Sequence, residues 1–142
     1  MIPVQRNWTP IKSGRFFQLY LDVMNRAKEV KLWPITKRFP KLYLQKASTK
    51  TMGVCYYCCK DGVYDFAIIL NEVLLDCSDD VVRKILVHEV AHAIRPNECH
   101  GYYWFQAADI IGDKWGYKAE RCVYDEEVTA AIEKLLAKRK MA

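Results

Sequence analysis

Histidine is scarce in this sequence: only three occur among 142 residues, and all three lie between His88 and His100. No apolar run approaches the roughly 20 residues that cross a bilayer, and the longest, Phe66–Leu70, suits a buried strand. Residues 1–7 lack the apolar core of a secretory signal peptide. We therefore expect no membrane partner and an intracellular location, either cytoplasmic or in the nucleoid or nucleus.

Internal repeats, low-complexity tracts and linkers rich in glycine and serine are also missing, so we expect one domain over residues 1–142. A hydrophobic content of 51% and a charged content of 27% are typical of soluble globular proteins. The six cysteines are too scattered for a compact disulfide framework, which predicts free thiols or metal ligands in a reducing compartment. Cys55 and Cys58 would point to opposite faces of an extended strand, which argues against a second metal site there.

Acidic residues are rare in the first 50 positions, where eleven lysines and arginines face only two acidic side chains. The rest of the chain is net negative, so the positive charge is localised, as on a surface that meets a polyanion. Basic side chains bind phosphates and aromatic rings stack on unpaired bases, which makes single-stranded or damaged DNA a candidate partner. The alternative is a solvated basic face with the aromatic rings in the core. The candidate contacts are Lys31, Trp33, Lys37, Arg38 and Lys41.

The first half of the chain predicts one helix followed by three strands. Apolar residues recur at three- and four-residue spacing between a capping Ser13 and a helix-breaking Pro34. The Asp61-Gly62 pair is typical of a hairpin turn, and Phe66–Leu70 is apolar on both faces, so its strand should be central. The expected elements are a helix over 15–30, a strand over 42–45 and a hairpin of strands over 53–59 and 63–71.

The second half predicts three helices. Ser78 or Asp79 caps the first, Pro96 ends it, and Gly112 is the expected C-cap of the second. The expected helices cover 79–94, 102–111 and 125–138. These elements make an α+β domain with an N-terminal helix, a three-stranded sheet that includes a hairpin, then a central helix and two further helices.

The central helix contains His88-Glu89-Val90-Ala91-His92, an H-E-x-x-H motif. Four residues are about one helical turn, so the two histidines lie on one face with Glu89 beside them. Two imidazoles at this spacing can hold Zn²⁺ while the carboxylate reaches an adjacent water. The rest of the helix is apolar nearly all round, and burying these polar groups without a metal would be costly. The motif therefore predicts an active-site helix, one catalytic zinc ion and Glu89 as general base.

A catalytic zinc usually has three protein ligands and an open position. We favour His100 as the third ligand, because it would otherwise be a lone histidine and because Gly101 beside it allows a close backbone approach. Cys99 and Glu98 are the competing ligands. An oxyanion donor is usually needed as well, and the sequence does not rank the candidate tyrosines, which are Tyr102, Tyr103, Tyr117 and Tyr124.

Three stretches carry a family pattern: a Gly-x-Cys strand in Thr51–Cys55, an apolar strand and Leu-Leu turn in Phe66–Leu75, and an H-E-x-x-H-A plus H-G-x-x-aromatic signature in His88–Trp104. Together they resemble the SprT-like (Spartan-type) zinc metalloproteases over roughly residues 10–122. The resemblance implies a zincin-like fold. It also implies that Glu89 is the catalytic acid/base and that the zinc ligands are His88, His92 and His100.

The same resemblance implies a class of partner. Better-studied members of the family cleave proteins, including proteins crosslinked to DNA, and use DNA as an activator. Many members also carry a C-terminal zinc ribbon with four cysteines, whereas only Cys122 follows the protease motif here. The ribbon is therefore absent from this sequence, and DNA binding is either lost or moved onto the protease domain.

We therefore predict a monomeric, zinc-dependent endopeptidase that acts on protein substrates, including DNA-bound or DNA-crosslinked proteins. Two alternatives stay open. A non-catalytic module that keeps zinc for stability and binds DNA or protein would not need Glu89. A general peptidase without a DNA link would lack salt-sensitive DNA binding.

Overall fold

A computed structural model describes residues 2–123 and 125–141 and shows one α+β domain. The sheet has four strands: β1 (Trp8–Pro10), β2 (Lys41–Gln45), β3 (Gly53–Lys60) and β4 (Val63–Asn71). The four α-helices are α1 (Gly14–Glu29), α2 (Asp79–Ile94), α3 (Tyr102–Gly112) and α4 (Glu126–Lys140). Two short 3₁₀ helices join them, η1 (Glu72–Asp76) and η2 (Asp113–Trp115).

The strand order is β1-β2-β4-β3, so the apolar strand β4 lies inside the sheet, as predicted. β2 runs parallel to β4, and β3 pairs with β4 as the predicted antiparallel hairpin. At the hairpin turn Asp61 has φ 53° and Gly62 has φ 77°. Two consecutive left-handed residues are what a two-residue turn of type I′ requires, which confirms the Asp-Gly prediction. The arrangement leaves β3 as an edge strand.

The prediction of three strands was wrong, because β1 pairs antiparallel with β2 and makes a fourth. β1 has only three residues and ends in Pro10, so it offers no alternating pattern to detect. Proline removes a backbone donor and is tolerated on an edge strand, which is where β1 lies. This strand depends on a partner more than 30 residues away rather than on its own sequence.

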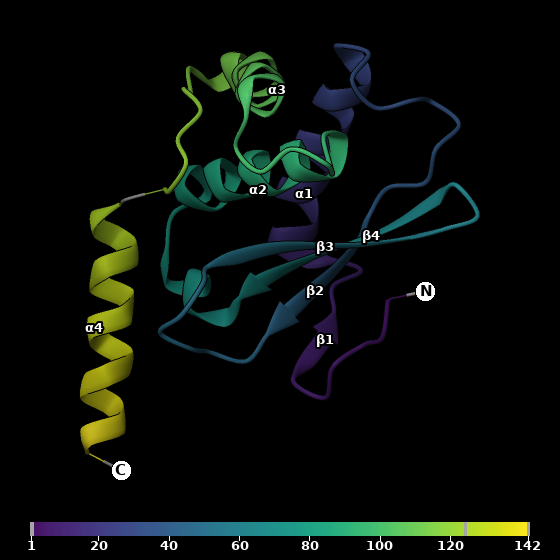
Figure 1. Cartoon of the computed structure of the whole chain (residues 1–142). Coiled ribbons are helices and arrows are strands. Elements are labelled where there is room, and N and C mark those ends of the chain that lie inside the picture. Colours follow the sequence, from purple (N-terminus) through teal and green to yellow (C-terminus); the bar gives the residue numbers. More distant parts are fainter. Residues whose placement is uncertain (1, 124, 142) are drawn as a thin grey trace.

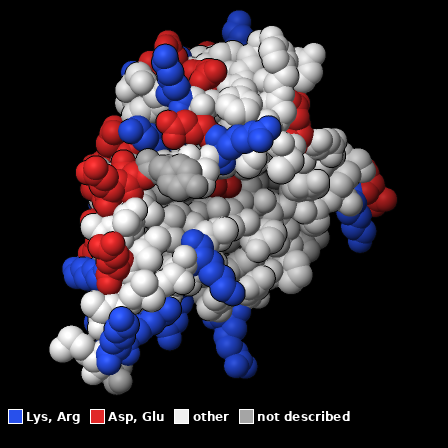
Figure 2. Space-filling model, turned by 60° about the vertical axis from the view of Figure 1, so that its left-hand side comes forward, with Lys and Arg blue, Asp and Glu red and all other residues white. Residues whose placement is uncertain are grey.

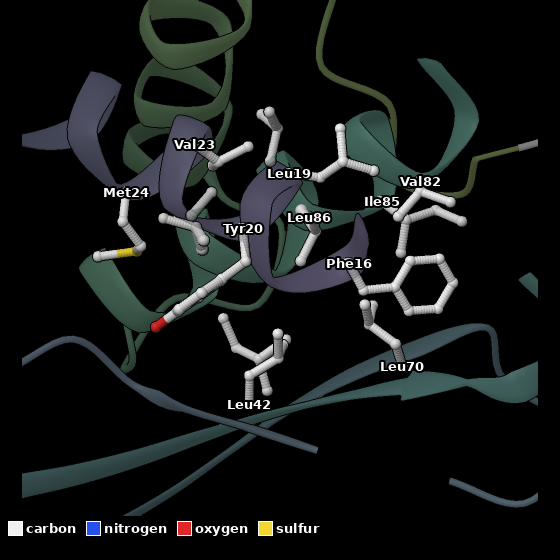
Figure 3. Close-up of a cluster of buried hydrophobic side chains, with 14 of the residues drawn as sticks. Phe16, Leu19, Tyr20, Val23, Met24, Leu42, Leu70, Val82, Ile85 and Leu86 are labelled. Carbon is white, nitrogen blue, oxygen red and sulfur yellow. The ribbon is translucent and has the colours of Figure 1, made fainter. Parts of the chain in front are cut away.

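Helices α1 and α2 cover one face of the sheet, and α3 packs on their far side (Figure 1). Figure 3 shows the core between these layers, where side chains of α1 and α2 meet those of the sheet. Burial of such side chains is the main stabilising contribution, at roughly 25 cal/mol for each Å² of apolar surface removed from water. The labelled core residues are Phe16, Leu19, Tyr20, Val23, Met24, Leu42, Leu70, Val82, Ile85 and Leu86.

The helix ends agree with the sequence except at Ser13, which lies at the N-cap of α1 without a side-chain cap hydrogen bond, and at Gly112. Ser78 is the N-cap of α2, and its hydroxyl accepts a hydrogen bond from the Val81 amide. Gly112 is not a C-cap: it lies in the last turn of α3 with φ −70°, and the left-handed residue is Gly116. A Cβ on Gly112 would lie 3.0 Å from Cβ of Tyr117, so close packing explains this glycine.

Helix α4 stands apart from the other helices and packs beside η1 (Figure 1). Its N-cap is Asp125, whose carboxylate accepts a hydrogen bond from the Glu127 amide. Across residues 2–123 and 125–141, no helix is both long and apolar enough to span a membrane.

Candidate metal centre and cleft

Three imidazoles converge where α2 faces the loop that leads into α3. His88 and His92 lie one turn apart on α2, and their Nε2 atoms are 3.3 Å apart. Nε2 of His100 lies 3.1 Å from each of them. Nitrogen ligands bound tetrahedrally at about 2.05 Å lie roughly 3.3 Å from one another. The spacing of the three nitrogens therefore fits a single metal ion of zinc's size.

Hydrogen bonding orients the first of these rings. Nδ1 of His88 lies 3.1 Å from the carbonyl oxygen of Glu120, which can only accept, so Nδ1 carries the proton. Nε2 of His88 is then an unprotonated lone pair aimed at the other two rings. Burial, reinforced by neighbouring imidazoles, lowers the pKa of His88 and of His92 to about 4. Neutral imidazole is the form that binds a metal.

Trp104 forms the inner wall of the histidine cluster. Its side chain is fully buried, and its ring centroid lies 4.8 Å from that of His88, 5.3 Å from that of His92 and 4.6 Å from that of His100. Contact with all three rings restricts their rotation. The sequence identified Trp104 only as the aromatic residue of a signature, and its position one helical turn after His100 was the available signal.

The carboxylate of Glu89 lies beside the cluster, with Oε2 4.0 Å from Nε2 of His88. Glu89 is only 5% exposed, and burial raises its pKa to about 8. A cation held by the histidines would oppose this shift and favour the carboxylate. The structure thus places a buried carboxylate next to three nitrogens that could hold a metal ion.

Gly53, the first residue of β3, makes room for that carboxylate. A Cβ at this position would lie 2.8 Å from Cγ2 of Ile85 and 3.1 Å from Oε2 of Glu89. Any larger residue would therefore displace the glutamate or the helix. The sequence placed Gly53 in a family-like strand without a role, because a contact across 36 positions leaves no local signal.

The structure distinguishes His100 from Glu98 and Cys99, the two alternatives for the third ligand. Glu98 turns back over Gly101 and caps α3, since its Oε1 accepts hydrogen bonds from the amides of Tyr103 at 2.5 Å and Trp104 at 3.3 Å. A Cβ on Gly101 would collide with this carboxylate. Cys99 is exposed and lies outside the convergent group. His100 itself reaches the cluster in a left-handed conformation, with φ 56°.

A pocket of about 440 Å³ opens beside Glu89. Its walls come from the start of β3, from α2, from residues 121–123 and from α4. Figure 2 shows this side of the molecule, hollowed next to α4, with basic side chains above and below the hollow. A second pocket, of about 290 Å³, lies between α2, α3 and residues 116–123 and also reaches His88.

The candidate nucleic-acid contacts divide into two groups. Trp33 is only 2% exposed, and its indole N–H donates to the Lys37 carbonyl, so the expectation that it stacks on bases is wrong. Nζ of Lys37 lies 4.5 Å from the centroid of the Trp33 ring. Lys37, Arg38 and Lys41 border an open groove that Lys60 of the hairpin also lines, whereas the exposed Lys31 lies outside it.

The tyrosines considered as oxyanion donors lie in different parts of the structure. Tyr102 and Tyr103 are exposed at the start of α3, and the Tyr117 hydroxyl donates to Asp80 at 2.5 Å. Tyr124 lies outside the described residues.

All six cysteines are free thiols. Cys55 packs against the core, and burial raises its pKa to about 12.

Comparison with known proteins gives one match. The family model described as SprT-like family matches residues 15–124. Neither the curated proteins nor the solved structures contain a match. The matched range includes α1 from its second residue, the strands β2 to β4, the histidine cluster and α3, and it stops before α4.

Proposed function

Since the chain belongs to the SprT-like family, we propose that it is a zinc-dependent endopeptidase. One observation carries the proposal. Three imidazole nitrogens lie within 3.3 Å of one another, beside a buried carboxylate. The free thiols fit an intracellular site of action, where such groups stay reduced.

The geometry of the site supports a role for each residue. His88, His92 and His100 would hold the zinc ion, which would supply a Lewis acid for a peptide carbonyl and lower the pKa of a bound water to about 7. Glu89 takes a proton from the attacking water as general base and returns it to the leaving amine. Glu120 and Trp104 keep the imidazoles in the orientation that binding requires.

The open side of the site supports a polypeptide substrate. β3 is an edge strand whose outer backbone groups have no strand partner in the described sheet. An extended peptide can pair with such an edge through main-chain hydrogen bonds. Because Gly53 of β3 lies against Glu89, a peptide on this edge passes the acid–base group.

The decisive experiment compares zinc-loaded wild type with Glu89→Gln on an unfolded protein substrate. We expect the variant to keep its zinc and to cleave roughly 10²–10⁴-fold more slowly. Zinc content measured by mass spectrometry is the control. Equal cleavage by the two proteins would contradict the assignment and favour a non-catalytic zinc module.

A second proposal concerns DNA. Lys37, Arg38, Lys41 and Lys60 line one groove, which supports contact with the phosphates of single-stranded or damaged DNA. On this proposal the substrates are proteins bound or crosslinked to DNA. Lys41→Glu with Lys60→Glu should weaken DNA binding and reduce its salt dependence. Cleavage that ignores DNA, together with salt-independent binding, would instead indicate a general peptidase.

A further inference from the structure

Helix α4 contributes a wall to the cleft that contains Glu89. The family match ends at residue 124, and α4 begins at Glu126. Three of its residues nevertheless line the same pocket as His88 and Glu89: Val128, Thr129 and Ile132. Part of the substrate-facing surface therefore comes from a segment outside the matched family region.

Contacts along the length of α4 hold this wall in place. Near its start, the carboxylate of Glu127 accepts hydrogen bonds from the amide and the hydroxyl of Ser78, both at 2.8 Å. In its second half, Lys134 pairs with Asp76 at 3.8 Å, and a guanidinium N–H of Arg139 donates to the Ala47 carbonyl at 3.1 Å. Val128 and Ala131 are buried between these contacts. The wall is thus attached to η1, to the start of α2 and to the loop before β3.

The chemistry of the pocket favours an apolar group. Apolar side chains from the loop before β3, from α2, from residue 123 and from α4 line the pocket, together with the basic side chains of Lys50 and Arg121. The acidic side chain at the α4 end, Asp125, is engaged as the N-cap of α4. At about 440 Å³ the pocket falls in the size range of ordinary ligand sites. The apolar lining residues are Met52, Ile85, Val123, Val128 and Ile132.

We propose that α4 is the specificity-determining wall of this cleft and that the pocket binds a large apolar side chain of the substrate, such as leucine, methionine or phenylalanine. The inference rests on the proposed peptidase function. The side chain belongs to a residue next to the scissile bond, because Glu89 and His88 line the same pocket. Val128 and Ile132 line the pocket from α4, Met52 from the loop before β3 and Ile85 from α2.

Cleavage of a mixed peptide library by the zinc-loaded full chain tests the proposal, with cut sites mapped by mass spectrometry. Wild type should prefer a large apolar residue beside the cut by 10- to 100-fold over alanine. Ile132→Trp fills the pocket and should move the preference to alanine or glycine. Thr129→Trp, which starts from an exposed residue and so endangers the fold less, should move it in the same direction. Leu136→Trp is the matched control, because Leu136 is exposed on α4 away from the pocket.

A binding measurement separates this inference from the proposed function. Zinc-loaded Glu89→Gln is titrated with two fluorescent peptides that differ only in one residue, leucine or alanine, at the preferred position or, if no cleavage occurs, at each position in turn. We expect tighter binding of a leucine peptide, and loss of that difference when Ile132→Trp is added. A zinc-loaded wild type that cleaves nothing contradicts the peptidase function alone. An unchanged preference in Ile132→Trp and Thr129→Trp, with folded proteins by circular dichroism, overturns the role of α4.

Discussion

Helices α2 and α4 have similar lengths and similar first turns, yet they are held in different ways. Each begins at an oxygen-bearing N-cap, Ser78 or Asp125, followed by two acidic residues. Nine side chains of α2 are buried, whereas two of the described side chains of α4 are. A helix packed on all sides can keep metal-binding nitrogens within tenths of an ångström. A helix attached along one face can vary in sequence and reshape a cleft without disturbing the core.

The largest effect on stability should come from substitutions that leave a cavity where α2 or α4 packs against the rest of the protein. Leu86→Ala, at a fully buried position of α2, should lower the free energy of unfolding by about 2–5 kcal/mol. Leu135→Ala on α4 should cost less, because Leu135 is only half-buried and loses fewer contacts. Urea denaturation of both variants measures the difference. Equal losses would mean that α4 is as integral to the core as α2.

Zinc binding should increase the difference in stability between α2 and α4. At a free concentration one hundred times its dissociation constant, zinc should raise the free energy of unfolding by about 2.7 kcal/mol. Hydrogen exchange should slow in α2 and in residues 98–104, and remain unchanged in α4, which holds none of the three histidines. His92→Ala should remove both effects. Undiminished stabilisation of that variant by zinc would place the metal elsewhere.

Breaking the contact between Ser78 of α2 and Glu127 of α4 should have a smaller effect on the free energy of unfolding. Ser78→Ala removes the N-cap of α2 and the hydroxyl that donates to Glu127, and should cost about 1 kcal/mol of unfolding free energy. Glu127→Gln should cost less, and the two changes together should cost less than the sum of the single losses, because they share one contact. Thermal denaturation of the single and double variants tests this. Strict additivity would show that the contact does not couple the helices.

The smallest effect concerns pH at the first turn of α2. The hydrogen bond from the Tyr117 hydroxyl lowers the pKa of Asp80, so the folded state binds this proton less tightly than the unfolded state. The resulting stabilisation is present above the unfolded pKa of about 4 and disappears as the pH falls through the lower folded pKa. Tyr117→Phe should therefore cost under about 1 kcal/mol at pH 7, since Asp80 is largely exposed. The loss should vanish near pH 2, and a loss that persists there would have another origin.

Short sequence patterns predicted the helices and the turn whose formation depends on neighbouring residues. Apolar periodicity located α1, the cap at Ser78 and the terminating Pro96 located α2, and the Asp61-Gly62 pair located the β3–β4 turn, because neighbouring residues cause these features. Two of the errors have a common reason. Pro10 joined a strand, and Trp33 entered the core, because of distant partners that no short window of sequence contains. Gly112 was misread for a different reason: its partner Tyr117 is only five residues away, but the close packing between them is not visible as a sequence pattern.

The sequence by itself determined that His88 and His92 share one face of a helix with Glu89 beside them, because the α-helical repeat alone produces that arrangement. Tertiary structure decided the rest of the site. It moved Glu98 onto the end of α3, brought His100 to the pair, set Gly53 against Glu89 and closed one side of the cleft with α4. Apart from the Glu98 cap, these contacts join residues eight or more positions apart, and such distances are bridged only when the core packs.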